Sequence, residues 1–522
     1  MFDGLTIAHI PAYGTTTYLA DNDAVIFEDG TTTKSLTWRQ LDESTSRLAN
    51  HILSTGPRRR HIALLFQNSL EFVESVFAVA KADCVAVVIN ARLTGREIDF
   101  CFQKADVDLV LSAHEFKPVL DEVVSAIPRL GKDKVLYLDG KEPGGIADWR
   151  LNASLVNPEL DIDPDSNSTI LFTSGTTGSP KAGIYTHRRL SQTWDCFSRE
   201  MCTSRHDRVL IAAPMYAGLG MNFAIGTLYL GGSALIVHRF DPEVIIKAID
   251  KHKPTMTPLA PTMYYILNEA YEKTSGDMSS VRTCLSLGSS LTPPVRGMIQ
   301  KLFPSGEIYE LYGSTETGPT VMLHPEDGGR HIVENGRIIY SVGQAVMGVK
   351  VRLLDDDGND VPIGEVGEIY KKNLLGTCVY YKNPELTASI YRGEWLTAND
   401  LGRQDKDGHV YIIGRKKDMI VTGGLNVYAS DVEEVLSRFP NIGMLAVVGF
   451  PHEKWGEAVT AVIQGREADY SVDALKQHCK ENLADYKRPR EFVFVDALPL
   501  TPSGKIEKYK LADLFYRPKE SA

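Results

Sequence analysis

The sequence predicts an α/β fold with mostly parallel sheets, divided into more than one domain. Helix-like and strand-like stretches alternate early in the chain, at residues 36–54, 62–66, 70–82 and 85–89. Such alternation is typical of parallel sheets covered by helices. A length of 522 residues also exceeds what one hydrophobic core normally supports.

The pattern changes after about residue 340, where the strand-like stretches become shorter and richer in Gly and Asp. Residues 349–354, 366–371 and 410–413 are of this kind, and Asp-Gly pairs at 357–358 and 407–408 mark turns. Short strands joined by such turns are typical of an antiparallel, barrel-like structure. We therefore expect a barrel-like part to follow the parallel sheets.

The composition is that of an ordinary globular enzyme, with 43% hydrophobic and 24% charged residues. The 56 basic residues are outnumbered by 67 acidic ones, which argues against a general nucleic-acid binder. The basic run Arg58-Arg59-Arg60-His61 is the local exception. We interpret it as a solvated loop before a strand, with a phosphate or CoA contact as the alternative.

Neither a targeting signal nor a membrane span is visible in the sequence. The first residues lack a basic leader and an apolar core. The most apolar stretch, residues 77–89, is interrupted by Lys81 and Asp83 and is too short to cross a bilayer, so it predicts a helix end and a buried strand. Seven cysteines without paired spacing fit neither a disulfide framework nor a zinc site. A reducing, cytoplasmic location without integral membrane association is therefore expected.

Residues 173–181 have the composition of a loop that binds polyphosphate, and they follow the strand-like run 168–172. The glycines would let backbone N–H groups converge on phosphate oxygens, the hydroxyls would add donors, and Lys181 would add a positive charge. The spacing is not that of a Walker loop, because two residues separate Gly175 from Gly178 and Pro180 precedes Lys181. By composition alone, a flexible surface turn remains an alternative.

Further motifs follow in a fixed order, namely Tyr-Gly-Ser-Thr-Glu-Thr-Gly at 312–318, Gly-Arg-Lys-Lys-Asp at 414–418 and Pro-Ser-Gly-Lys at 502–505. With Leu-Thr-Trp at 36–38 and Gly-Glu-Val-Gly-Glu at 364–368, this set resembles the adenylate-forming superfamily over nearly the whole chain. It is most similar to the acyl-CoA synthetases of that group. In that family a carboxylate attacks the α-phosphate of ATP to give an acyl-adenylate and pyrophosphate, and a thiol then displaces AMP.

The resemblance implies a large N-terminal domain, residues 1–414, made of two parallel α/β subdomains plus a distorted β-barrel. It also implies a small mobile α+β C-terminal domain, residues 415–522, which swings between an adenylating and a thioester-forming pose about a pivot at Lys417. The four consecutive charges at 415–418 would be costly to bury, which independently indicates a solvent-facing junction. A plain surface charge cluster is the alternative.

The nucleotide site is likewise implied by the resemblance. Glu316 would bind Mg²⁺ through a hard oxygen, Thr315 would bind a phosphate, and Tyr312 would lie against adenine. Asp400 would accept hydrogen bonds from the ribose hydroxyls, with support from Arg415. The full set of expected ATP- and AMP-binding residues is Thr173, Ser174, Gly175, Thr176, Thr177, Gly178, Lys181, Gly288, Ser289, Ser290, Tyr312, Gly313, Ser314, Asp400 and Arg415.

One position departs from the family pattern. The usual Thr-Gly-Asp around the ribose carboxylate is replaced by Ala398-Asn399-Asp400. A threonine hydroxyl and a glycine turn are both missing, but Asn tolerates the left-handed backbone better than most residues. We therefore expect Asn399 to keep the turn.

The catalytic residues implied by the resemblance are Lys505, Thr315 and Glu316. Lys505, in a glycine-containing loop, would bridge the attacking carboxylate and the α-phosphate during adenylation, whereas an ordinary exposed lysine is the alternative. In the second pose, Gly423 and Gly424 would let the pantetheine arm of CoA pass close to the backbone.

The acyl pocket is expected where many relatives carry Pro-Leu-Phe-His and this chain has Pro-Met-Tyr-Ala at 214–217. An alanine therefore stands where a histidine often gates the tunnel. The predicted lining residues are Tyr216, Ala217, Gly218, Met221 and Phe223. This mixture of small and large side chains suits a short branched, medium-chain or aromatic acid.

The resulting prediction is an ATP-, Mg²⁺- and CoA-dependent carboxylic acid–CoA ligase, whose partners are small molecules and not nucleic acid. Three other functions stay open: a stand-alone adenylating enzyme that loads a carrier protein, an ADP-forming phosphotransferase, and a non-catalytic nucleotide-binding relative. The sequence leaves the acid and the oligomeric state open, with a homodimer as one arrangement to be tested.

Overall fold

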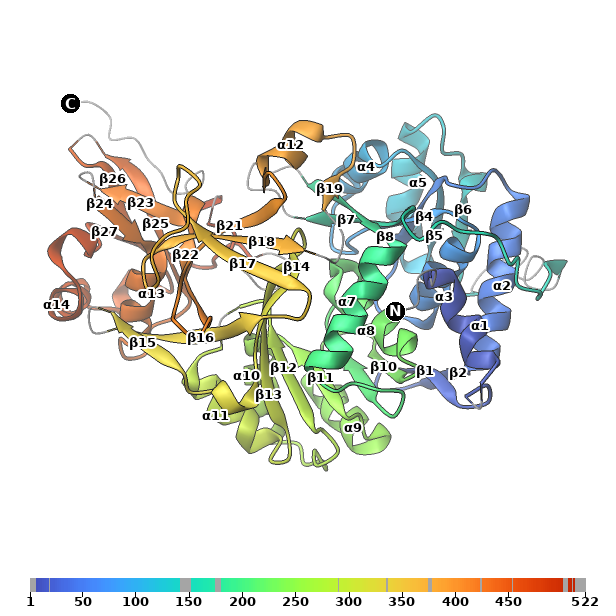
Figure 1. Cartoon of the computed structure of the whole chain (residues 1–522), viewed down its shortest axis with the longest axis horizontal. Helices are drawn as coiled ribbons and strands as arrows, with labels where there is room; N and C mark the ends of the chain where they lie inside the picture. Colours follow the sequence, from blue (N-terminus) through green and yellow to red (C-terminus); the bar gives the residue numbers. More distant parts are fainter. Residues whose placement is uncertain are drawn as a thin grey trace.

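The computed structural model describes residues 6–17, 19–140, 152–173, 180–289, 291–334, 337–373, 378–422, 425–452, 454–500, 506–508, 510 and 511. In this part of the chain the strands form three sheets, of fifteen, seven and five strands. Figure 1 shows the N-terminal α/β region at one end and the C-terminal unit at the other, with the long sheet between and below them. The α/β architecture with a small C-terminal unit confirms the predicted fold class.

The seven-stranded sheet is built from the early alternation of strands and helices. Its strands, in spatial order, are β19 (Val379–Tyr380), β8 (Lys181–Thr186), β7 (Asn167–Thr173), β4 (Val85–Val88), β3 (His61–Leu65), β5 (Val107–Ser112) and β6 (Val135–Tyr137). The strands from β7 to β6 are parallel to one another. Strand β8 pairs antiparallel with β7, and β19 pairs antiparallel with β8. The helices of this region are α1 (Ile10–Thr15), α2 (Trp38–Ser54), α3 (Leu70–Lys81), α4 (Gly95–Lys104) and α5 (Lys117–Ala126).

The long sheet begins with a parallel half. In spatial order its strands are β13 (Glu307–Ser314), β12 (Thr283–Leu287), β11 (Met256–Leu259), β9 (Arg208–Ile211), β10 (Ser233–Val237) and β1 (Asp23–Glu28), with β2 (Thr33–Thr37) antiparallel at the edge. The associated helices are α7 (His187–Glu200), α8 (Leu219–Tyr229), α9 (Pro242–His252), α10 (Pro261–Tyr271) and α11 (Pro293–Leu302). Helix α8 contacts β9 and β10 of this sheet and also α3 of the first region, so it lies between the two sheets. It is apolar over most of its surface because it is buried on more than one side.

The same sheet continues past β13 as an antiparallel, barrel-like part. The order is β14 (Gly318–Leu323), β16 (Arg337–Ala345), β22 (Val410–Arg415), β21 (Trp395–Gln404), β18 (Gly367–Asn373) and β17 (Val349–Leu354). Strand β15 (His331–Glu334) pairs with β16, β20 (Tyr391–Arg392) pairs with β21, and α12 (Pro384–Ser389) precedes β20. The short strands expected after residue 340 are thus antiparallel, as predicted.

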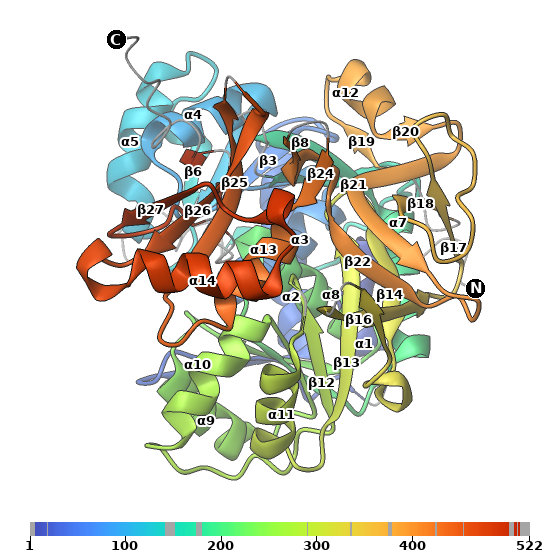
Figure 2. The same cartoon turned by 90° about the vertical axis from the view of Figure 1, so that its left-hand side faces the viewer.

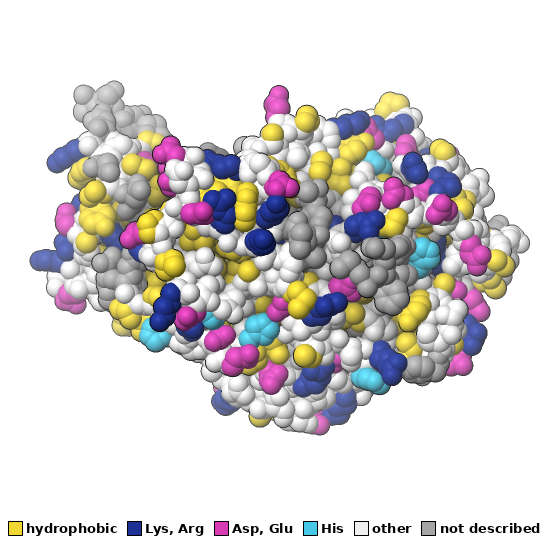
Figure 3. Space-filling model, in the orientation of Figure 1, with side chains coloured by type: hydrophobic (Ala, Val, Ile, Leu, Met, Phe, Trp, Pro, Cys, Tyr) yellow, Lys and Arg dark blue, Asp and Glu magenta, His cyan; other side chains and the backbone are white. Residues whose placement is uncertain are grey.

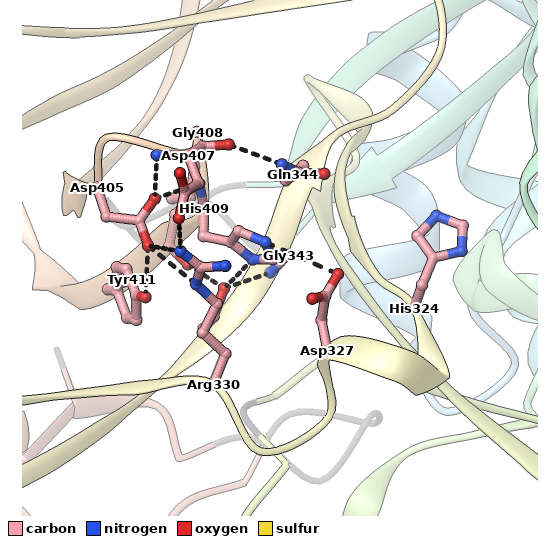
Figure 4. Close-up of polar contacts among 12 residues, drawn as sticks. His324, Asp327, Arg330, Gly343, Gln344, Asp405, Asp407, Gly408, His409 and Tyr411 are labelled. Carbon is pink, nitrogen blue, oxygen red and sulfur yellow. Dashed lines mark hydrogen bonds and ion pairs between the residues drawn. The ribbon is translucent and has the colours of Figure 1, made fainter.

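A polar network fixes the β21–β22 hairpin against the segment that precedes β15 (Figure 4). Arg330 donates from Nε to Asp405 at 3.1 Å and also bonds Asp407, while Tyr411 donates its hydroxyl to Asp405 at 2.8 Å. The buried His409 lies 3.7 Å from the Asp327 carboxylate. These contacts hold the Asp-Gly turn at 407–408, where Gly408 has φ +87°, and so fix the strands that carry Asp400 and Arg415.

The C-terminal unit has its own sheet, in the order β24 (Leu425–Tyr428), β23 (Met419–Thr422), β26 (Gly456–Gln464) and β25 (Leu445–His452), with β27 (Glu491–Val495) beside β26. Helices α13 (Ala429–Ser437) and α14 (Val472–Asn482) pack on it around a separate core that includes Val432, Val459 and Leu475. Figure 2 shows this unit facing the viewer, in front of the other two sheets.

The basic run at residues 58–61 differs from the expected solvated loop. Arg58 is partly exposed and pairs with Asp83 at 2.6 Å. Arg60, however, is buried and donates to the Ile52 carbonyl at 2.5 Å and to Thr55 Oγ1 at 2.7 Å. The prediction is therefore wrong for Arg60, because its guanidinium is buried and donates to backbone carbonyls and a hydroxyl at the end of α2.

Other sequence predictions can be compared with the structure directly. The stretch 77–89 is the end of α3 followed by the buried strand β4, as predicted. All seven cysteines are free thiols, and within the described ranges no helix is long and apolar enough to cross a membrane. Acidic and basic side chains are interspersed over the face shown in Figure 3.

Candidate active site

The predicted nucleotide residues of the long sheet lie where parallel strands β12 and β13 end. Ligands of open α/β sheets bind at this carboxyl edge. Gly288 follows β12 with φ +91°, and a Cβ at this position would meet no atom within 4 Å, so the backbone here borders open space. Ser289 beside it is exposed. Gly313 and Ser314 form the end of β13, and strands β14 and β16 lie between β13 and the junction strand β22.

Asp400 connects this edge with the junction to the C-terminal unit. Tyr312 donates its hydroxyl to Asp400 Oδ2 at 2.6 Å, and Arg415 Nε lies 3.4 Å from Asp400 Oδ1. Burial, followed by the Asp400 charge, raises the pKa of Tyr312 well above its usual value, so the phenol stays protonated and remains a donor. Asn399 adopts φ +62°, the left-handed conformation expected where the family has glycine. Its N–H donates to Thr397 Oγ1 at 2.8 Å, which steadies the turn.

Glu316 and Lys181 come from motifs far apart in sequence but meet around one tyrosine. Tyr380 donates its hydroxyl to Glu316 Oε1 at 2.8 Å, and Lys181 Nζ lies 5.8 Å from the centroid of the same ring. The pairing of β19 with β8 brings Tyr380 to this place. The structure thus unites the start of β8, which follows the predicted phosphate loop, with the Thr315-Glu316 motif.

Lys417 lies in the short helix Lys416–Asp418, between the last strand of the long sheet and the first strand of the C-terminal sheet. Its pKa is lowered, first by partial burial and then by the positive charges of Arg415 and Lys181. The predicted pivot is therefore close enough to feel the charges of Arg415, predicted to support the ribose, and of Lys181, predicted to bind phosphate.

The five predicted acyl-pocket residues do not share one environment. Ala217, at the end of the short helix Met215–Ala217, is exposed. Tyr216, Met221 and Phe223 are buried within the core. Phe223 lines a cavity of about 20 Å³ with Trp194 and other residues, which has room for about one water molecule. Gly218 has φ +85° and starts α8, and an added Cβ would lie 2.9 Å from Leu171.

Several predicted residues lie outside the described part of the chain. These are Ser174, Gly175, Thr176, Thr177, Gly178, Ser290, Gly423, Gly424 and Lys505, and the side chain of Thr173 is also outside it.

The structure adds four side chains that the sequence did not single out, all beneath residues 315–319. They are Tyr185, Arg189, Lys371 and Tyr380. Lys371 stands two residues after the buried Ile369 on β18, at a position where strand alternation places a side chain on the same face. A lysine at an inward-facing position of a predicted strand could have indicated a functional role for Lys371. No local sequence pattern distinguishes the other three side chains.

Comparison with known proteins agrees with this arrangement. The family model for AMP-binding enzymes matches residues 16–381, and the model for the C-terminal domain of AMP-binding enzymes matches residues 431–505. The chain is 32% identical over 481 residues to a feruloyl-CoA synthase of an Amycolatopsis species, covering 91% of this chain and 93% of that protein. It is 32% identical over 427 residues to a sulfoacetate–CoA ligase of Cupriavidus necator, covering 81% of each.

A solved structure of an anthranilate–CoA ligase in complex with anthranoyl-AMP superposes with a TM-score of 0.86. The two chains are 25% identical, and 98% of each is covered.

The fold and the converging motifs define an adenylate-forming enzyme, and the chain belongs to the AMP-binding enzyme family. Within that family it is an ATP-binding acyl-CoA synthetase, an AMP-forming acid–CoA ligase.

Proposed function

We propose that this enzyme joins a short branched, medium-chain or aromatic acid to CoA through an acyl-adenylate, with Mg²⁺ bound at Glu316. The observation that carries the proposal is the convergence of Tyr312, Asp400 and Arg415 at the sheet edge, with Tyr312 and Arg415 both contacting the Asp400 carboxylate. A carboxylate held at this place can accept hydrogen bonds from ribose hydroxyls. The acid substrate is already ionised at neutral pH, so adenylation needs positioned cations and donors more than a general base.

The residues present fit Mg²⁺. The side-chain carboxylate of Glu316 offers hard oxygens. Among the described residues it accepts a hydrogen bond only from the neutral phenol of Tyr380, and no Lys, Arg or His nitrogen there forms an ion pair with it. No group of three potential metal-ligating side chains is found among the described residues. One carboxylate supplemented by phosphate oxygens and water is a typical Mg²⁺ arrangement. When bound, the ion would screen charge on the departing pyrophosphate.

The C-terminal unit, residues 415–522, is proposed to move about Lys417 between the two half-reactions. The change from the long sheet to the separate C-terminal sheet at residues 415–419 supports a boundary there. In the adenylating pose Lys505 would reach the substrate carboxylate and the α-phosphate. After the swing, Gly423 and Gly424 would line the path of the pantetheine arm.

The acid is proposed to enter beside Ala217. This side chain is exposed just before α8, in the segment that follows the carboxyl end of β9, a strand of the same parallel part of the sheet as β12 and β13. The feruloyl-CoA synthase and the anthranilate–CoA ligase among the similar proteins support an aromatic acid. The sulfoacetate–CoA ligase, which is similarly close, is named for a small polar acid, so the acid must be determined by experiment.

A panel of branched, medium-chain and aromatic acids, assayed with ATP, Mg²⁺ and CoA, tests the proposal. We expect acid-dependent release of AMP and pyrophosphate with formation of an acyl-CoA, ranked by kcat/KM. ADP as the product would indicate a phosphotransferase. Transfer to a carrier protein but not to CoA would indicate a carrier-loading enzyme, and no turnover of any acid would indicate a non-catalytic relative.

Ala217→Phe tests the place of the acyl pocket. The added ring should lower kcat/KM for the larger accepted acids by at least about tenfold relative to the smallest, since a misfit in an apolar pocket costs about 1–3 kcal/mol. The KM for ATP should stay unchanged. Equal losses for all acids, or weaker ATP binding, would show that residues 214–223 do not form the pocket.

A further inference from the structure

Two buried basic side chains donate hydrogen bonds to the backbone of residues 315–319. Arg189 of α7, 3% exposed, donates from Nη2 to the carbonyls of Thr315 at 3.1 Å and Glu316 at 2.8 Å. Lys371 of β18, 1% exposed, donates from Nζ to the carbonyl of Pro319 at 2.9 Å and also to that of Thr317. Both cations therefore bind backbone carbonyls directly behind the motif that carries Thr315 and Glu316.

The contacts come from separate parts of the fold. The Arg189 guanidinium lies 4.1 Å from the centroid of the Tyr185 ring, and the Tyr185 hydroxyl donates to the Thr315 carbonyl at 2.5 Å. Tyr185 belongs to β8 of the seven-stranded sheet, whereas Lys371 belongs to the barrel-like part of the long sheet. The segment is thus fixed relative to both regions, including the strand that follows the predicted phosphate loop.

The support of residues 315–319 does not by itself explain why an ionisable side chain, that of Lys371, is buried at this place. Among the described residues no Asp or Glu oxygen lies within 4.0 Å of its ammonium group. Burial, followed by the positive charge of Arg189, lowers the pKa of Lys371 to about 7. Keeping two like charges together in the interior is unfavourable for folding. Lys371 is thus only partly protonated near neutral pH, but its protonated form and Arg189 together place positive charge behind the loop. This charge favours an anionic ligand in front of the loop, because charge in a poorly solvated site acts strongly.

We propose that Arg189 and Lys371 are positioning residues for adenylation, which hold Thr315 and Glu316 at the place where the triphosphate of ATP and its metal ion bind. They act through the backbone carbonyls of residues 315–319 and do not touch the substrate. The inference rests on the proposed function, since it assigns ATP to the face of the loop opposite the two cations. It implies that their loss affects the step that uses the triphosphate and spares the step that uses an acyl-adenylate already formed.

Arg189→Met and Lys371→Met in the full chain test the proposal, because methionine keeps much of the side-chain length and removes the charge. Lys81→Met and Arg60→Met are matched controls. Lys81 is equally buried and bonds Asp42 at 2.5 Å and Ser46 at 2.8 Å, while Arg60 also donates to backbone carbonyls in a buried place. For each variant, acid-dependent pyrophosphate exchange, thioester formation from a supplied acyl-adenylate, and Tm would be measured.

We expect Arg189→Met and Lys371→Met to reduce kcat/KM for MgATP in pyrophosphate exchange by about 10–10² fold, somewhat below the effect of removing a direct electrostatic donor. Thioester formation should stay within about twofold of the parent. The controls should lower Tm without separating the two half-reactions. Arg189→Lys, which restores a positive charge with fewer donors, should recover part of the exchange rate and serves if Arg189→Met does not fold. Lys371→Arg serves in the same way for Lys371→Met.

Equal loss of both half-reactions, or the same selective loss in the controls, would overturn the proposal and leave the two cations a purely structural role. Failure of the proposed function would look different. In that case the parent enzyme itself would show no acid-dependent pyrophosphate exchange with any acid.

Discussion

The segment that carries Thr315 and Glu316 is held from behind by Arg189 and Lys371, whereas the junction at residues 415–418 is held by ion pairs that solvent reaches. Arg189 and Lys371 are almost completely buried. At the junction, the side chain of Arg415 is 47% exposed and meets the buried Asp400. Lys416 is 39% exposed and pairs at 2.7 Å with the exposed Asp356 and at 3.0 Å with the buried Glu368. Exposed ion pairs contribute little to stability, while buried charged groups that lose their partners cost several kcal/mol.

The difference suggests that the two regions have different roles in the proposed reaction. Residues 315–319, with the strands that carry them, form what we call the fixed wall of the proposed ATP site. This wall must keep its shape through adenylation, and buried, charge-assisted hydrogen bonds resist its displacement. The junction is proposed to release and re-form contacts in each turnover, and ion pairs whose basic partner is partly exposed suit this movement. Variants behind Thr315 and Glu316 should therefore affect adenylation most, whereas a variant that restricts the pivot should affect thioester formation most.

The largest effect is expected at Lys505, in the C-terminal unit that we propose to move between the two half-reactions. Lys505→Ala should reduce acyl-adenylate formation by about 10²–10³ fold, the scale of removing one electrostatic donor. Thioester formation from a supplied acyl-adenylate should be largely unchanged, because the lysine acts only in the first pose. Single-turnover assays of each half-reaction provide the measurement. If both rates fall equally, the assignment of Lys505 to one pose is wrong.

On the fixed wall, Glu316→Gln should raise the Mg²⁺ concentration needed for half-maximal adenylation by about tenfold, since a neutral amide is a poorer ligand for a hard cation. The amide can still accept the hydrogen bond from Tyr380, so the loop should keep its position. Tyr380→Phe is the matched control, because it removes that hydrogen bond and keeps the carboxylate. Identical Mg²⁺ titrations of Glu316→Gln and the parent would exclude Glu316 from the metal site.

At the junction, Lys417→Pro should slow thioester formation more than adenylation, by about tenfold in their ratio. Proline fixes φ near −65° and restricts the residue before it, so it limits the proposed pivot. Lys417→Ala, which removes the charge but leaves φ free, is the control and should change the ratio little. An unchanged ratio for the proline variant would place the pivot elsewhere.

The sequence predicted the parts of the molecule that local patterns encode. The strand β7, the left-handed Asn399 and the change to antiparallel strands after residue 340 all depend on neighbours in the chain. The support beneath residues 315–319 could not be predicted, because Arg189, Lys371 and Tyr380 meet there only through contacts between different regions of the fold. Arg60 illustrates the same limit, since it looks like part of an exposed basic run but satisfies carbonyls at the end of a helix.

The smallest effect on catalysis is expected at Glu310, a buried carboxyl behind the adenine side of the fixed wall. It accepts a hydrogen bond from the Leu291 N–H at 3.0 Å, and burial raises its pKa to about 7. Because the pKa in the folded state lies above the ordinary value, the folded state binds the proton more tightly than the unfolded state does. The stability that this proton contributes is present below about pH 4.5 and is lost as the pH rises to about 7.

Glu310→Gln keeps an acceptor for Leu291 and removes the titration, so its advantage in stability over the parent should grow between pH 5 and pH 8. The growth should be up to about 3 kcal/mol, from about 1.4 kcal/mol for each unit of pKa shift. Denaturant unfolding of both proteins at several pH values measures it, while adenylation at pH 8 should stay within about twofold. A pH-independent difference would show that Glu310 is ionised in the folded protein throughout this range. The hydrogen bond from Leu291 and the charge of Arg296 would then outweigh the burial that favours the protonated form of Glu310.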